Sequence, residues 1–120
     1  MSGSIPEAVP DMMAEKFRTL SDPARLRILR TLLAGEKSVG QVVDETGQRQ
    51  GNVSKHLKQL AGSGLIARRK EGLQVFYRVE DPLAEELCLM VCRTILRQAE
   101  RQMKRESDVV ANTNSKSIKL

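Results

Sequence analysis

The middle of the chain, from Gly47 to Lys70, carries a run of hydrogen-bond donors and cations without a carboxylate. Gln and Asn side chains can make paired hydrogen bonds to adenine, and Ser and Lys can reach guanine or either base. Lys and Arg also neutralise phosphate, whereas duplex DNA, with about one negative charge per 1.7 Å of its axis, would repel a carboxylate. The run therefore indicates contact with nucleic acid. The candidate residues are Arg49, Gln50, Asn52, Ser54, Lys55 and Lys58, followed by Arg68, Arg69 and Lys70.

The positive charge of the protein is concentrated in this same segment. Residues 48–78 contain seven Lys or Arg and one acid, Glu71, whereas the whole chain of 120 residues has a net charge of +5. The rest of the chain is therefore close to neutral, and the basicity belongs to one segment. A basic helix face taken alone is more often a solvated surface, so the order of the surrounding elements must decide between the two interpretations.

The first two predicted helices lie near the N-terminus. Apolar residues at spacings of four and three predict the first helix over residues 10–20. The second helix starts after Asp22, a typical N-cap, with Pro23 at its first position, and Gly35 is a typical stop signal. Its predicted buried face consists of Leu26, Leu29 and Leu33, flanked by Ile28 and Leu32.

The next two segments form a helix-turn-helix pattern. Residues 38–47 are predicted to form a two-turn helix that ends in Gly47. In the helix that follows, Val53, Leu57 and Leu60 make a narrow apolar stripe, and the lysines project from the opposite side. His56 lies at the edge of this stripe, where a packed, hydrogen-bonded histidine is favoured over a base contact. A short helix, a turn and a second helix with a polar outer face are typical of DNA-binding proteins.

A β-hairpin is predicted directly after these helices. Residues 65–70 and 75–79 have β-forming character and flank the turn sequence "EGLQ". A helix-turn-helix followed by a basic hairpin is a winged helix, in which the second helix of the pair enters the major groove and the hairpin lies along the backbone or the minor groove. Arg68, Arg69 and Lys70 are expected to contact phosphate from this wing.

The last predicted helix begins at "DPLAEELC" and carries an apolar stripe over about six turns, made of Leu83, Leu87, Val91, Ile95 and Ala99. So long a stripe needs a partner, which predicts a homodimer formed through the first and last helices. The fold class is therefore mainly α with a small β-hairpin. The winged-helix and dimerisation domain is expected over residues 10–105, with flexible tails at 1–9 and 106–120.

These motifs resemble the ArsR/SmtB family of winged-helix repressors. The similarity covers roughly Ala14 to Glu100, and its most specific parts are "DPxRLxIL" from Asp22 and "VSxHLxxLxxxGL" from Val53. The resemblance implies a homodimer that binds an inverted-repeat operator in double-stranded DNA and leaves it when a metal or a chemical signal is sensed. It also implies that Gln50, Ser54 and Lys55 face the bases, and that residues 68–70 belong to the wing.

The sequence departs from this family at the metal sites. Metal-sensing relatives often carry a "CxC" pair in the first helix of the helix-turn-helix, or Asp and His ligands on the last helix, and this chain has neither. Cys88 and Cys92 remain, four residues apart on the last helix and thus on one face. Two interpretations stay open: small apolar side chains in a dimer interface, or sensor thiols that take a soft metal or a thiol modification. No other cofactor is expected.

Other classes of protein fit the residues less well. An enzyme is not expected, because the sequence holds no phosphate-binding glycine loop, no Ser-His-acid set and no CxxC at a helix N-terminus. A nonspecific architectural DNA protein would need only cations, whereas Gln50, Asn52 and Ser54 favour the reading of bases. No signal peptide or membrane span is evident, which predicts a cytoplasmic protein. The sequence names neither the operator nor the inducing signal.

Overall fold

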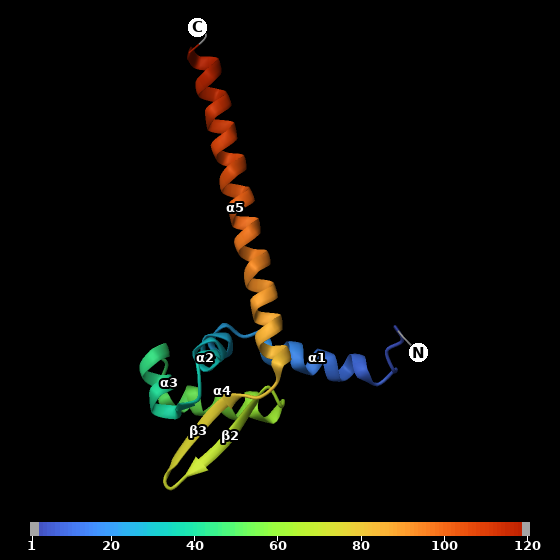
Figure 1. The fold of residues 1–120 in the computed structure, drawn as a ribbon, viewed down its shortest axis with the longest axis vertical. Coiled ribbons are helices and arrows are strands. Elements are labelled where there is room, and N and C mark those ends of the chain that lie inside the picture. The colour runs from blue at the N-terminus through green and yellow to red at the C-terminus, as the bar shows by residue number, and fades with distance from the viewer. Residues whose placement is uncertain (1–2, 119–120) are drawn as a thin grey trace. The chain divides into compact units, whose positions relative to one another are not determined.

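The computed structural model describes residues 3–118, and it describes side chains as far as residue 113. The chain forms two compact units, Met1–Glu85 and Glu86–Leu120. In the first unit, α2, α3 and α4 lie together, and the hairpin of β2 and β3 projects away from α4 (Figure 1). The mainly helical fold with a small hairpin confirms the predicted fold class. In chain order the elements are α1 (Val9–Leu20), α2 (Pro23–Leu33), β1 (Lys37–Ser38), α3 (Val39–Thr46), α4 (Gln50–Gly62), β2 (Ile66–Glu71), β3 (Gln74–Val79) and α5 (Pro82–Ile118).

Local capping fixes the limits of α2, as predicted. The Asp22 carboxylate accepts hydrogen bonds from the backbone N–H groups of Ala24, at 2.8 Å, and Arg25, at 3.2 Å. The hydrogen bond from the Arg25 backbone is the main reason why the pKa of Asp22 lies below its usual value. After the helix, Gly35 adopts a φ of 148°, a conformation that side chains with a Cβ rarely adopt.

The turn between α3 and α4 is held by several side chains. Ser38 caps α3, and Gln41 bonds back to the Ser38 backbone, which completes a capping box. Gly47 ends α3 in the left-handed conformation with φ 70°. The Gln48 side chain then donates a hydrogen bond from Nε2 to the carbonyl of Ala24 at 3.1 Å, which ties the turn to the start of α2.

The core is an apolar contact between α2, α3, α4 and the base of the sheet. The stripe Val53, Leu57 and Leu60 of α4 is fully buried, as predicted. On α2 the prediction of the buried face was wrong at Leu26, which is 40% exposed, and Leu33 is only half-buried. The helix instead buries Ile28, Leu29 and Leu32. The sequence is compatible with either of two neighbouring apolar stripes on this helix, and packing against the rest of the core selects this one. The buried core residues are Ile28, Leu29, Leu32, Val42, Val53, Leu57, Leu60, Leu65, Ile66, Tyr77 and Ala84.

The predicted hairpin is part of a three-stranded antiparallel sheet with the order β1-β3-β2. The short strand β1 pairs with β3 and was not foreseen, because two residues carry no alternation signal. Strands β2 and β3 pair from Ile66 with Val79 to Glu71 with Gln74, which leaves a two-residue loop. Its first residue, Gly72, has a φ of 60°, as hairpin loops of this length require.

The last helix, α5, is longer than expected. Asp81 Oδ1 accepts the N–H of Leu83 at 2.9 Å and so caps the start of the helix. The segment 106–118, expected as a tail, is helical, because neither Gly nor Pro follows Leu83 before Ile118 to end the helix. The flexibility of this segment and of residues 1–9 stays a prediction, as do the domain limits 10–105; residues 1–2 and 119–120 lie outside the described residues. Within the described part of the chain, no helix is both long and apolar enough to span a bilayer.

The two faces of α4 should respond very differently to truncation. Leu57→Ala should lower the free energy of unfolding by about 2 to 5 kcal/mol, since the side chain is fully buried. The adjacent exposed change, Lys58→Ala, should stay within about 0.5 kcal/mol. Urea unfolding followed by far-UV circular dichroism measures both. An equal loss for the two variants would contradict the described orientation of α4.

Candidate nucleic-acid interface

The outer face of α4 presents the side chains that the sequence singled out. Arg49, Gln50, Asn52, Lys55 and Lys58 are exposed, and Ser54 is half-buried. We call these six residues the outer face of α4. None of its three cations forms an ion pair with another described residue. The structure therefore brings together, on one helix, polar side chains that are free to meet a ligand.

The first turn of α4 adds backbone donors to this face. Arg49 occupies the N-cap position, and no side chain caps the helix there. The first N–H groups of a helix have no intrahelical acceptor, and they carry the positive end of the helix dipole. Such a turn favours an anion, and phosphate is a common one.

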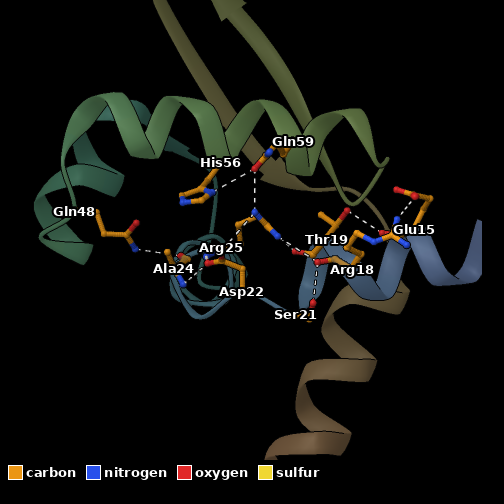
Figure 2. A network of polar contacts seen from close by, with 10 residues as sticks. All are labelled: Glu15, Arg18, Thr19, Ser21, Asp22, Ala24, Arg25, Gln48, His56 and Gln59. Atoms are coloured by element: carbon orange, nitrogen blue, oxygen red, sulfur yellow. Dashed lines mark hydrogen bonds and ion pairs between the residues drawn. The ribbon is translucent and has the colours of Figure 1, made fainter.

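His56 lies beside this face rather than on it. The imidazole is half-buried, with Nδ1 at 3.4 Å from Oε1 of Gln59 on the next turn. This geometry agrees with the interpretation of His56 as a packed, hydrogen-bonded side chain. Figure 2 shows the ring between α4 and the start of α2, close to Gln59.

The wing, residues 66–79, sorts its three consecutive cations onto two faces of the sheet. Side chains alternate along a strand, so Arg68 and Lys70 share the face of Ile66, while Arg69 lies on the opposite face with its cross-strand partner Phe76. Both Arg68 and Lys70 are exposed. The structure therefore separates Arg69 from the two cations with which the sequence grouped it.

Arg69 is held by carboxylates of the same protein. Its Nη2 lies 2.7 Å from Glu36 Oε1 and its Nη1 lies 2.7 Å from Glu71 Oε2. The guanidinium also lies 4.7 Å from the centre of the Phe76 ring. The hydrogen bond from Arg69 lowers the pKa of Glu36, so this carboxyl is ionised and paired at neutral pH.

Arg78 joins the same cluster. Its guanidinium lies 4.0 Å from Glu36 and 3.3 Å from Glu80. Two of the seven cations in the basic segment, Arg69 and Arg78, are thus neutralised by carboxylates of the same chain. The sequence did not predict the pairing with Glu36, because Glu36 is 33 residues from Arg69. The local signals of the pairing were Glu71, two residues from Arg69, and Glu80, two residues from Arg78.

The two thiols differ in exposure. Cys88 is half-buried and Cys92 is exposed, and both are free. Burial raises the pKa of the Cys88 thiol, which lowers its thiolate fraction at neutral pH. The described residues contain no group of three or more His, Cys, Asp or Glu side chains placed to hold a metal ion.

A short helix, a glycine turn, a second helix with an exposed polar face and an antiparallel hairpin together define a winged helix-turn-helix, a DNA-binding fold. Known proteins give the family. The model described as "Bacterial regulatory protein, arsR family" matches residues 22–68. The probable mercury resistance operon repressor of Streptomyces lividans is 35% identical over 89 residues, which cover 74% of this chain and 71% of that protein.

Solved structures agree with this assignment. The crystal structure of Rv0081 from Mycobacterium tuberculosis has a TM-score of 0.66 and 35% identity, covering 78% of this chain and 94% of that one. The solution structure of the homodimeric winged helix-turn-helix domain of Mb0332 from Mycobacterium bovis, a possible ArsR-family regulator, has a TM-score of 0.73 and 28% identity. It covers 84% of this chain and 95% of that one. The chain belongs to the ArsR family, whose members are DNA-binding transcriptional regulators.

The Arg69 cluster should stiffen the wing in the absence of DNA. Arg69→Ala removes two ion pairs and a cation–π contact, so the backbone amides of β2 and β3 should exchange hydrogen severalfold faster. The neighbouring change Arg68→Ala should leave these rates nearly unchanged. Hydrogen exchange followed by NMR measures both variants. Equal protection in the two would show that the cluster contributes nothing to the order of the wing.

Proposed function

We propose that this protein is a transcriptional repressor that binds an inverted-repeat operator as a homodimer and acts by binding DNA rather than by catalysis. The outer face of α4 carries this proposal, since its amides and cations are exposed, its hydroxyl is half-buried, and none of the cations pairs with an acidic side chain among the described residues. A fully buried stripe on the other side of the same helix holds the face outward. We place the protein in the cytoplasm, where such an operator lies.

Each part of the interface has a role in this proposal. Gln50, Asn52 and Ser54 read base edges in the major groove, and Arg49, Lys55 and Lys58 contact phosphate or guanine. Arg68 and Lys70 of the wing contact phosphate. Arg69 supports the wing from its other face, because its guanidinium is already bound by Glu36 and Glu71.

The exposed apolar side chains of α1 and α5 support the homodimer. No residue of α1 is buried in the single chain, and Phe17 is 52% exposed. Along α5, Val91, Ile95 and Leu96 are about half exposed as well. Large apolar side chains gathered on two helices favour a protein partner, and the related Mb0332 domain is homodimeric.

We further propose that a thiol-reactive species or a soft metal releases the repressor through Cys88 and Cys92. The relative from Streptomyces lividans carries mercury resistance in its name, and thiolates prefer soft ions of that kind. Cys92 is the more accessible thiol. The raised pKa of Cys88 favours the alternative, in which both residues only pack and the winged helix senses nothing here.

Base reading can be separated from general attraction to DNA. Gln50→Ala and Ser54→Ala should each weaken binding to the cognate operator by about 1 to 3 kcal/mol and spare a random duplex. As a matched control, Lys70→Ala should weaken both duplexes and lower the slope of log K against log salt by about one. Fluorescence anisotropy titrations at several salt concentrations measure all three. Equal losses on both duplexes for Gln50→Ala and Ser54→Ala would favour a nonspecific architectural protein.

The thiol proposal has its own test. Cadmium, arsenite, a persulfide donor or an oxidant should weaken operator binding by the native protein, by the roughly 5- to 150-fold that allosteric coupling usually provides. The double variant Cys88→Ser, Cys92→Ser should bind equally well with and without each reagent, and Cys88→Ser alone should keep part of the response through the exposed thiol. Unchanged binding by the native protein under all four treatments would assign the cysteines to packing.

A further inference from the structure

Helix α1 contributes no buried residue to the core of the first unit. None of its twelve residues is buried, and its apolar side chains Met13 and Phe17 are 39% and 52% exposed. A groove of about 600 Å³ separates part of α1 from the C-terminal end of α4, with Lys16 on one side and Gln59 and Gly62 on the other. No fully buried apolar side chain of α1 therefore fixes its orientation relative to α4.

Arg25 joins the end of α1 to α4 through directional hydrogen bonds. Its side chain is only 15% exposed. Nε donates to the carbonyl of Thr19 at 2.6 Å and Nη2 donates to the carbonyl of Arg18 at 3.2 Å. These carbonyls belong to the last turn of α1, where intrahelical donors run out and the helix dipole favours a cation. Nη1 reaches in the other direction and donates to Oε1 of Gln59 on α4 at 3.0 Å (Figure 2).

A second cation joins the same two helices. Lys16 on α1 donates from Nζ to the carbonyl of Ser63, the C-cap residue of α4, at 2.8 Å. The two contacts lie on either side of the junction, one at the last turn of α1 and one nearer its middle. Hydrogen bonds to a charged donor are stronger than neutral ones, and two of them at different points resist rotation as well as separation.

We propose that Lys16, Arg25 and Gln59 form a polar clamp that sets the angle between α1 and α4, and thereby the separation of the two recognition helices in the dimer. This inference rests on the proposed function, in which α1 meets a second copy and α4 reads a half-site. The clamp does not involve the buried stripe of α4. Loss of the clamp therefore leaves the reading of a single half-site intact. Arg25 is accordingly a positioning residue for operator spacing.

The spacer between operator half-sites gives the readout. Affinities are measured for a single half-site duplex and for inverted repeats whose spacers differ by one base pair. Native protein should prefer one spacer length. Arg25→Met keeps much of the side-chain volume but removes all donors, so the ratio of the best to the worst spacer should fall about tenfold, as expected for the loss of a charged hydrogen bond. Half-site affinity should stay within about twofold of the native value.

Three further variants make the test specific. Gln59→Met removes the acceptor from an exposed position on α4, which avoids a folding defect, and should flatten the spacer preference in the same way. The double variant Arg25→Met, Gln59→Met should be no flatter than Arg25→Met alone, because Arg25→Met already removes the bond to Gln59. Arg27→Met changes an exposed arginine on α2, the helix that also carries Arg25, and should keep the native spacer profile.

The outcomes separate the clamp from the proposed function. A sharp, native spacer preference in both Arg25→Met and Gln59→Met, with only a lower melting temperature, would overturn the clamp and leave Arg25 a structural residue. If the native protein itself prefers no spacer, recognition of an inverted repeat is overturned, and the clamp with it. A flattened preference in both variants together with a native profile in Arg27→Met supports the clamp.

Discussion

The burial of one narrow stripe on α4 against α2 determines what the rest of the molecule can do. Val53, Leu57 and Leu60 are wholly inaccessible, and they lie against a core that includes Leu29 and Leu32. A rotation of α4 by one residue, about 100°, would move a lysine toward the core and a leucine into water. The hydrophobic register therefore fixes the direction of every polar side chain on the outer face, even though these side chains make few contacts with the protein themselves.

Arginine has two distinct uses in this small domain. Arg25 and Arg69 have their guanidinium groups occupied by carbonyl, amide or carboxylate oxygens of the same chain, in each case between segments distant in sequence. Arg49 and Arg68 are exposed and have no such partners among the described residues. The planar fork of five donors suits the first use, because it can bind several acceptors at once. The net charge of the basic segment thus overstates the charge that is available to DNA.

The sequence predicts those features whose causes are local. Asp22 and Pro23 predict the start of α2, and Gly47 predicts the end of α3. The structure places both helix limits at these residues. Features that depend on distant partners escape it. Arg69 is indistinguishable from its neighbours until Glu36 is brought beside it, and the exposure of Leu26 follows from the way α2 packs. The outer face of α4 was predictable because amphipathic spacing alone divides that helix into a buried and an exposed side. The end of α5 was not predictable, because no Gly or Pro there marks where the helix stops.

The absence of buried residues in α1 has an evolutionary consequence. Changes to core residues of α2 or α4 cost stability and are soon selected against, but the apolar surface of α1 lies outside the core of a single chain. Its side chains can therefore diverge while the DNA-reading unit still folds. A duplicated gene could in this way acquire a new pairing preference, so that two descendants in one cell would form separate assemblies without exchanging subunits. In the proposed dimer, the choice of partner and the reading of a single half-site would then depend on different parts of the same small chain.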